Sequence, residues 1–167
     1  MKKYVILFFA TVFSFSASAA SVPTELGEYG DWTAYSYKEG KNTICYMAST
    51  PKKDEGNYKK RGDIYAVVTH RPAEKSYNVV NFVAGYNYKI GSKVVVKIGT
   101  TSFNNLFTNV DSAWAPDNTT DKKLVETMKR GEKMTVEGLS YKGTKTKDTY
   151  SLKGFSNAYK AISAKCK

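Results

Sequence analysis

Residues 149–167 read TYSLKGFSNAYKAISAKCK, and this stretch changes from a strand-like to a helix-like pattern within a few positions. The segment 148–154 is typical of a β-strand that ends at a glycine. The apolar residues after it recur at i, i+3, i+4, i+7 and i+11, namely Phe155, Ala158, Tyr159, Ile162 and Cys166. This spacing predicts a helix over 154–166 with a single apolar stripe that ends in a thiol. We therefore expect a C-terminal helix that lies on a sheet, with Cys166 on its buried side.

The first 21 residues have the pattern of an export signal. Two lysines precede the apolar run YVILFFATVF, and the small-residue stretch SFSASAAS follows it. This arrangement predicts a signal peptide over residues 1–19, cleaved before Ala20 or Ser21, and a single domain over 20–167. The apolar run is shorter than the ~20 residues that a membrane-spanning helix needs, which disfavours an uncleaved anchor. No later segment could span a membrane, so we expect a periplasmic, outer-membrane-associated or secreted protein.

Cys45 and Cys166 are the only two cysteines of the chain. Disulfides form and persist in oxidising compartments, so an exported protein favours one intramolecular bridge between them. Cys45 lies in the strand-like segment 43–49, toward which the apolar stripe of the C-terminal helix could point its thiol. Two free thiols, or a bridge between molecules, remain the alternative.

Most of the domain has a period of two, which is typical of half-buried strands. Turn residues separate the apolar runs about every ten positions, and this favours a β-sandwich or barrel. The polar, lysine-rich stretch 50–62 is expected to be a loop. The expected strands, about eight in number, cover 30–37, 43–49, 63–70, 76–86, 92–99, 101–109, 132–141 and 148–154.

One further segment, 116–131, breaks the period of two. Asn118 or Thr119 could cap the start of a helix, and Gly131 would end it. Leu124, Val125 and Met128 would form its apolar face. We expect this helix in a connection between strands.

The chain is strongly basic, with a formal net charge of +11 that falls to +9 without Lys2 and Lys3. The lysines are scattered through turns and helix faces and form no compact stripe, and export argues against nucleic acid as a partner. Solvated surface lysines are the simplest interpretation. Adhesion to an anionic envelope surface, such as lipid headgroups or acidic glycans, is the alternative.

The sequence contains no recognisable catalytic, metal-binding or cofactor-binding motif. His70 is the only histidine, and it ends a strand-like segment without a nucleophile and an orienting carboxylate at useful spacing. Asp148 and Ser151 lie three apart on a strand and so would face opposite sides. We expect no catalytic residue, no metal and no cofactor.

Weak candidates for partner binding are His70, Arg71 and Trp114. Arg71 precedes Pro72 and could contact an anion. Trp32 is expected in the core, whereas Trp114 could either plug the end of the core or form an exposed binding platform; packing is favoured.

Several motifs, in order along the chain, resemble the invasion-associated locus B family of exported bacterial proteins. They are GDWTAYSY, ICYMAS, IYAVVTHRP, AGYNYKIGSKVVVKI, FTNVDSAWAPD, LVETMKRGEKMTVEG and SYKGTKTKDTYSLKGFSNAYKAISAKC. This resemblance implies an immunoglobulin-like β-sandwich and a periplasmic or outer-membrane-associated location. It also implies an association with host-cell invasion in some pathogens. The chain departs from many members at Ser36, where a cysteine is often found, which would leave Cys45 and Cys166 as its only pair.

These observations together predict an exported envelope protein that binds a partner and is not an enzyme. The partner would be an envelope or host protein, a glycan or an anionic membrane surface. The alternatives are a hydrolase of envelope polymers with an unrecognised site near His70, and a periplasmic chaperone-like structural factor.

Overall fold

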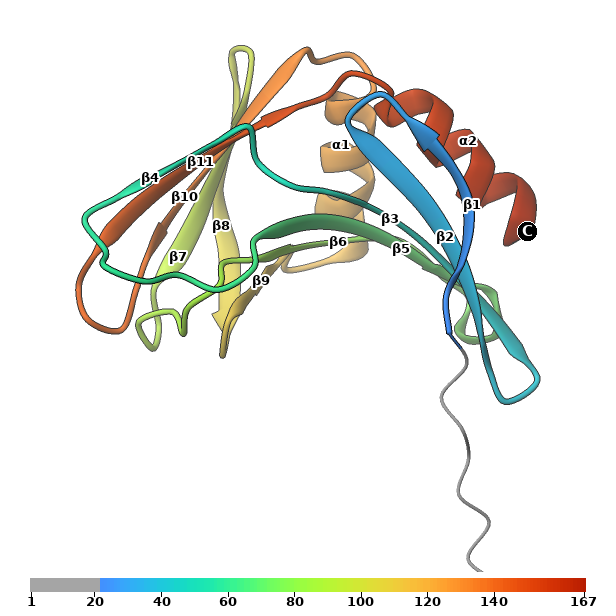
Figure 1. Cartoon of the computed structure of the whole chain (residues 1–167), viewed down its shortest axis with the longest axis horizontal. Helices are drawn as coiled ribbons and strands as arrows, with labels where there is room; N and C mark the ends of the chain where they lie inside the picture. Colours follow the sequence, from blue (N-terminus) through green and yellow to red (C-terminus); the bar gives the residue numbers. More distant parts are fainter. Residues whose placement is uncertain (1–21) are drawn as a thin grey trace, which may run out of the picture.

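Figure 1 shows the computed structural model of the chain, which describes residues 22–167. The expected signal peptide, residues 1–19, lies outside the described residues. Eleven β-strands, one short 3-10 helix and two α-helices form the domain. The strands of its N-terminal half are β1 (Thr24–Tyr29), β2 (Trp32–Glu39), β3 (Asn42–Ser49), β4 (Lys53–Gly56), β5 (Tyr65–Arg71) and β6 (Ser76–Val83), with the 3-10 helix η1 (Pro72–Glu74). The C-terminal half contains β7 (Lys93–Ile98), β8 (Thr101–Asn109), β9 (Ser112–Trp114), α1 (Asn118–Met128), β10 (Lys133–Leu139), β11 (Lys145–Ser151) and α2 (Phe155–Lys165).

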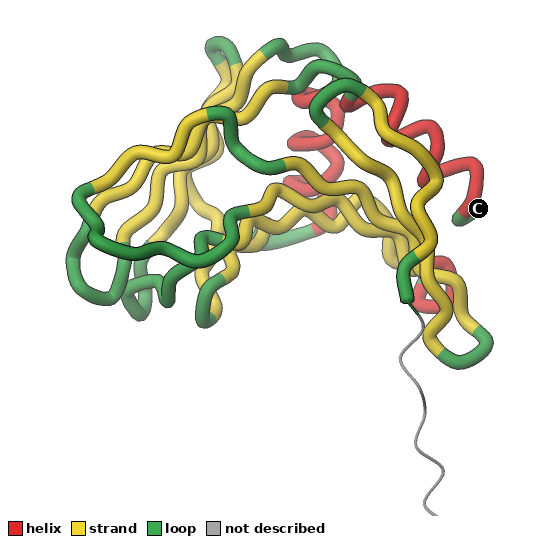
Figure 2. Tube along the Cα trace, in the orientation of Figure 1, coloured by secondary structure: helices red, strands yellow, loops and turns green. Residues whose placement is uncertain are grey.

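All eleven strands belong to one antiparallel sheet, in the order β1-β2-β3-β5-β6-β9-β8-β7-β10-β11-β4. The two separate sheets of the expected immunoglobulin-like sandwich are therefore not confirmed, and the strands outnumber the eight that the sequence predicts. The physical reason is β9, whose three residues pair with both β6 and β8. This short strand joins two groups of five strands that would otherwise be independent sheets, and Figure 2 shows the resulting bent, continuous sheet.

Three strands escape the sequence prediction for different reasons. β4 is the tetrapeptide KDEG inside the expected loop 50–62, and it pairs with β11 through its backbone alone. β1 shows no clean alternation because its register shifts between Glu25 and Gly27. β9 is only three residues long, which is too short for a periodic signal.

One face of the sheet carries buried side chains on every strand except β1 and β4, and we call it the inner face. On β2, for example, Trp32 and Ala34 are buried, whereas Thr33 and Tyr35 are only half-buried. Because the sheet is bent, inner-face residues of both strand groups enter a single core. That core includes Met47, Val68, Val80 and Phe82 from one group and Val96, Leu106, Met134, Val136 and Tyr150 from the other.

The two strand groups meet directly where β2 begins and β11 ends. The Trp32 indole Nε1 donates a hydrogen bond to the Ser151 carbonyl oxygen at 3.0 Å, and the Asp31 amide donates to the Lys153 carbonyl at 3.0 Å. Gly154, which caps α2, has φ +89°, and a Cβ atom there would lie 1.6 Å from the Tyr29 carbonyl oxygen. The glycine in the sequence LKGF is therefore required by the close approach of the β1–β2 turn.

Helix α1 packs on β6 and covers part of the inner face. Leu124, Val125 and Met128 are buried, as the sequence predicts. The N-cap is Asp117 instead of Asn118 or Thr119, because the Asp117 side chain accepts a hydrogen bond from the Thr120 amide. The prediction misplaced the helix start by one or two residues.

A buried carboxylate connects α1 to the sheet. Within β6, only residues 81–83 pair with β9. The amide of Val80, next to them, donates a hydrogen bond to the Asp121 Oδ1 atom at 2.9 Å. Asp121 is 5% exposed, and burial raises its pKa to about 6. The hydrogen bond from Val80 favours the ionised form and opposes this effect, while the neighbouring Asp117 adds to it.

Helix α2 packs on β1, β2 and β3 with the stripe that the sequence predicts. Phe155, Ala158 and Ile162 are buried, and the Phe155 ring meets the Trp32 ring edge-on with centroids 4.9 Å apart. Cys166, directly after the helix, forms a disulfide with Cys45 of β3. The structure thus contains the intramolecular bridge that the sequence favours, and it ties the end of the chain to β3.

A buried ion pair holds the β4–β5 connection. The Arg61 guanidinium donates two hydrogen bonds of 2.6 Å to the Asp148 carboxylate, and its Nε donates to the Ala84 carbonyl oxygen. Both side chains are almost completely buried, at 3% and 5% exposure. The rings of Tyr58 and Tyr86 lie within 5.3 Å and 5.1 Å of the guanidinium carbon. Every polar atom of the pair is therefore used within the fold.

Replacing both cysteines by serine should destabilise the domain from its C-terminal end. The disulfide closes a loop with a sequence separation of 121 residues. Loop-closure entropy predicts a loss of about 4–5 kcal/mol in the free energy of unfolding for a loop of this size. Denaturant unfolding measures the loss, and hydrogen exchange should show faster exchange of the α2 amides than of the β5 amides. Unchanged unfolding together with unchanged α2 protection would contradict the structural role of the bridge.

Asp121→Asn should stabilise the protein at neutral pH and change little near pH 4. The folded-state pKa of about 6 exceeds the ordinary aspartate value of 3.8, so the folded state binds the proton more tightly. The stability contributed by the protonated Asp121 is complete below about pH 4 and is lost as the pH rises through 6. The variant should gain up to about 3 kcal/mol above pH 6, from a difference of roughly two pKa units. The lowered pKa of His70 affects both proteins and cancels when their unfolding curves are compared; a pH-independent difference would refute the assignment.

Candidate functional site

His70, the only histidine, lies on the inner face of β5 beneath helix α2. Its side chain is 2% exposed, and it is paired in register with Cys45 of β3. The imidazole ring meets the ring of Tyr159 at 90° with centroids 5.5 Å apart. Burial lowers the pKa of His70, and the nearby Lys129 ammonium adds to this effect. His70 is therefore a neutral, enclosed side chain at physiological pH.

The hydrogen bonds of His70 determine which ring nitrogen carries the proton. The Asn78 backbone amide, which can only donate, lies 3.1 Å from Nδ1. We therefore assign Nδ1 as the acceptor and Nε2 as the nitrogen that carries the proton and donates to the Ser163 hydroxyl oxygen at 3.1 Å. The Thr69 carbonyl oxygen also lies 3.1 Å from Nδ1. In this tautomer both atoms are acceptors, so they form no hydrogen bond with each other.

The Ser163–His70 pair has the composition of a catalytic dyad but the opposite polarity. A general base must accept the hydroxyl proton through the nitrogen that faces the hydroxyl. That nitrogen is already protonated here, and the other nitrogen is held by a backbone amide instead of a carboxylate. The arrangement attaches α2 to the sheet, and the Tyr159 hydroxyl strengthens it by donating to the Asn78 side-chain oxygen at 2.6 Å.

Arg71, adjacent to His70, points to the opposite side of β5. Its guanidinium lies 3.2 Å from the Glu39 carboxylate and 3.5 Å from the Glu74 carboxylate. These two exposed partners compensate its charge. The sequence-based suggestion of an anion contact at Arg71 is thus weakened, because an incoming anion would compete with two carboxylates.

Trp114 lies on β9 with its side chain on the face opposite the core. Its neighbour Ala113 is completely buried in the core, and successive strand residues point to opposite faces. Trp114 is half-buried and in register with Asn81 of β6 and Phe107 of β8. It does not plug the core end, as the favoured interpretation of the sequence held, and its placement agrees better with the alternative of a surface platform.

The face that carries Trp114 continues across β6, β5, β3 and β2, where apolar side chains of neighbouring strands lie next to one another. We call it the outer face. Its residues alternate along each strand with those of the inner face, and neither α1 nor α2 packs on it. The rings of Tyr35 and Tyr46 are stacked with centroids 5.0 Å apart, and Tyr37 meets Tyr46 edge-on at 6.1 Å. The residues of the outer face on these strands include Tyr35, Tyr37, Ile44, Tyr46, Val67, Thr69, Val79 and Asn81.

The outer face is largely apolar; Arg71, on the same side of β5, is ion-paired with Glu39, and the tyrosine rings shield one another. Tyr46 is half-buried, and burial raises the pKa of its hydroxyl further from the physiological range. Ile44 is only 2% exposed although it faces away from the core. The signal for this face was present in the sequence as the alternation AYSY and ICYM, but alternation alone does not reveal that both sides of the strands are apolar.

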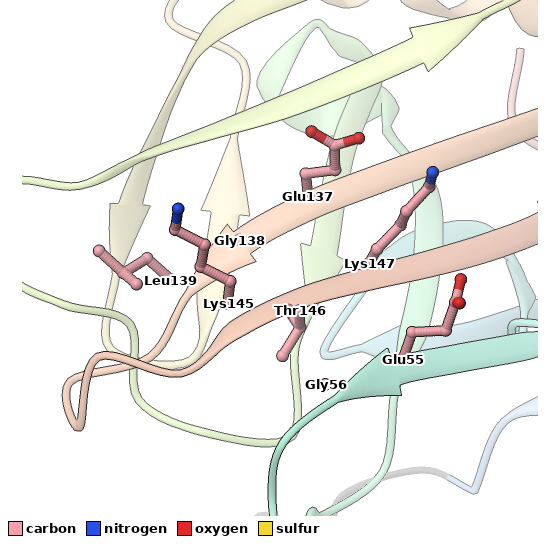
Figure 3. A pocket seen from close by; sticks show the side chains of 8 residues that line it. All are labelled: Glu55, Gly56, Glu137, Gly138, Leu139, Lys145, Thr146 and Lys147. Atoms are coloured by element: carbon pink, nitrogen blue, oxygen red, sulfur yellow. The ribbon is translucent and has the colours of Figure 1, made fainter.

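The surface also has grooves away from the outer face. Figure 3 shows one of about 550 Å³ over β10, β11 and β4. There Glu137 is in register with Lys147, and Lys147 with Glu55, so opposite charges alternate across the strands. Such an alternating pattern favours neither an anionic nor a cationic ligand.

The described part of the chain, residues 22–167, contains neither a metal-type cluster nor a membrane-spanning helix. Its His, Cys, Asp and Glu side chains form no group of three that could hold a metal ion. None of its helices is long and apolar enough to cross a membrane.

The structure does not bring the predicted site residues together. His70 is enclosed under α2, Arg71 is ion-paired on the other side of the same strand, and Trp114 lies on β9. Asp148 and Ser151 face opposite sides, as expected from their spacing: the Asp148 carboxylate binds Arg61, and the Ser151 hydroxyl accepts from the Lys153 amide. Sequence reasoning missed Arg61 and Asp121, because polar residues that become buried leave no periodic signal.

The chain has relatives among known proteins. The family model described as "Invasion associated locus B (IalB) protein" matches residues 32–163. A solved structure, invasion associated protein b from Bartonella henselae, has a TM-score of 0.56 at 16% identity and covers 86% of this chain and 96% of its own. That likeness shows a shared fold. No curated protein is significantly similar. Because the family model spans most of its length, the chain belongs to the invasion associated locus B family.

Proposed function

We propose that the protein is an exported, non-enzymatic envelope protein that binds a partner protein through its outer face. The observation that carries the proposal is the ring cluster of Tyr35, Tyr37 and Tyr46, which lies on a sheet face that neither helix covers. Aromatic side chains supply large contact area at low entropic cost and are enriched where proteins meet. The partner would belong to the envelope or to a host cell.

Export to the periplasm, to the outer membrane or beyond the cell is part of the proposal. It is supported by the signal-peptide pattern of residues 1–19 and by the disulfide between Cys45 and Cys166. Disulfides persist outside the cytosol, where no reducing thiol pool opens them. A role of the family in invasion suits a protein that presents a binding surface, and this role comes to the chain only as an analogy.

The arrangement at His70 argues against the alternative of a hydrolase. A hydrolytic site would need an accessible base that faces a nucleophile, and the only histidine is enclosed and protonated on the wrong nitrogen for that task. Of its polar contacts, the one to the Ser163 hydroxyl attaches α2 to the sheet.

Photocrosslinking through the outer face tests the proposal. A benzoylphenylalanine residue in place of Tyr37 should give a specific protein adduct in cells, whereas the same residue at Lys160, on the exposed side of α2, should not. Tyr35→Ser combined with Tyr46→Ser should reduce the adduct at least about tenfold, since aromatic anchors often contribute 2 kcal/mol or more. An equal yield at both positions would refute a site on the outer face. A crosslink to a glycan instead of a protein would contradict the protein partner and show that the outer face binds a glycan.

Ser163→Ala separates the binding and catalytic interpretations. The variant removes the only hydroxyl that faces His70 Nε2. We expect partner capture by the outer face to be unchanged and the free energy of unfolding to fall by about 1–2 kcal/mol, because the buried N–H loses its acceptor. Denaturant unfolding and the crosslinking yield measure the two effects. Loss of biological function in a variant that still folds and still captures its partner would revive the enzyme hypothesis.

A further inference from the structure

Three turns at one end of the molecule carry strongly exposed apolar side chains. Ile90 is 99% exposed, Val110 is 65% exposed and Tyr141 is 60% exposed. Apart from Val22, where the described chain begins, the other large exposed apolar side chains do not exceed 41%. We call the three turns together the turn end, formed by residues 88–91, 109–111 and 140–143.

Hydrogen bonds hold the three turns side by side. The Tyr88 amide donates to the Val110 carbonyl oxygen at 2.8 Å, and the Tyr141 amide donates to the Asn87 carbonyl oxygen at 2.9 Å. Tyr88 also forms an isolated β-bridge with Ser140. The segment that leads into β7 therefore lies between the β8–β9 turn and the β10–β11 turn, and in Figures 1 and 2 the three turns project from the same end of the sheet.

The turns themselves do not require these apolar residues. Val110 has φ 52°, a left-handed conformation that is costly for a β-branched side chain and that asparagine or glycine adopts far more readily. Ile90 precedes Gly91 in a turn and makes almost no contact that would remove its side chain from water. Exposed apolar groups of this kind, gathered in one place, mark a surface that meets another apolar phase.

Ammonium groups accompany the apolar tips. Lys60, Lys89 and Lys142 are exposed, and none of them is in an ion pair with another residue of the described range 22–167. Lys60 and Lys142 line a cavity of about 220 Å³ together with Tyr141. The nearest acidic group on these turns, Asp111, is half-buried and accepts a hydrogen bond from the Ser112 hydroxyl. The turn end is thus positively charged around its apolar tips.

We propose that the turn end docks the protein on a lipid membrane with anionic headgroups. Apolar and aromatic side chains at loop tips partition into the boundary between headgroups and acyl chains, and lysines beside them are attracted to anionic lipids. Ile90, Val110 and Tyr141 enter this boundary, and the ammonium groups of Lys60, Lys89 and Lys142 bind headgroup phosphates. A protein partner would not explain why the apolar groups are isolated tips on three turns instead of a continuous face. This docking goes beyond the proposed function, because it uses no residue of the outer face.

Vesicle sedimentation tests the docking. The protein, purified after export by the expression host, is mixed with vesicles of phosphatidylcholine alone or of phosphatidylcholine with phosphatidylglycerol. It should bind the anionic vesicles and bind less as salt is added. Ile90→Ser should weaken binding about tenfold or more, in line with the transfer of one large aliphatic side chain. Tyr77→Ser, which changes a 40% exposed ring on β6, is the matched control and should bind like the parent protein.

A second variant separates insertion from adsorption. In Ile90→Trp, the new indole should shift its emission to shorter wavelength with anionic vesicles, above the background of Trp32 and Trp114. Lys60→Gln combined with Lys89→Gln and Lys142→Gln should also reduce binding, while Lys160→Gln with Lys165→Gln on α2 should not. The proposal is overturned if the parent protein does not bind anionic vesicles, if Ile90→Ser binds equally, or if the emission of Ile90→Trp stays constant. Thermal unfolding of each variant and crosslinking at Tyr37 are measured in parallel. A failure of membrane docking can therefore be distinguished from a failure of partner binding by the outer face and from loss of folding.

Discussion

A single sheet with one continuous apolar face must find a cover for that face, and the rest of this structure follows from that constraint. Eleven strands give the inner face more area than the two helices can shield. The sheet therefore bends until its two strand groups share one core, and α1 and α2 cover what remains. The direct bonds from Trp32 to Ser151 and from Asp31 to Lys153, together with the glycine at position 154, fix where the two groups meet.

Buried polar groups secure this arrangement wherever the backbone of the sheet is interrupted. Asp121 takes the Val80 amide beside the end of the short strand β9, and Arg61 binds both Asp148 and the Ala84 carbonyl where the β4–β5 connection crosses the sheet. His70 connects the irregular register between β5 and β6 to α2 through Asn78 and Ser163. Each of these groups makes its polar contacts to the backbone or to a side chain of another element, so it fastens parts of the fold together.

The sequence predicts the parts of the fold that depend on local periodicity. The stripe of α2, the apolar face of α1, the buried Trp32 and most of the long strands belong to this class, since spacing alone determines which side of an element is apolar. β4 and β9 could not be predicted, because their pairing depends on distant backbone. For the same reason, the sequence does not show that β9 joins the two strand groups. It therefore cannot distinguish a sandwich of two sheets from one bent sheet. The partners of Arg61 and Asp121 likewise become visible only when the chain is folded.

The candidate surfaces were only partly accessible from the sequence. The sequence indicates Trp114 as a possible platform, but the face around it arises from residues of five strands that only the register places together. The turn end is assembled from segments near residues 90, 110 and 141, which no sequence window contains. The two surfaces use separate sets of residues, with the outer face on β2, β3, β5, β6 and β9 and the turn end on three connections. Docking on a membrane through the turns would therefore leave the rings of Tyr35, Tyr37 and Tyr46 available to a partner.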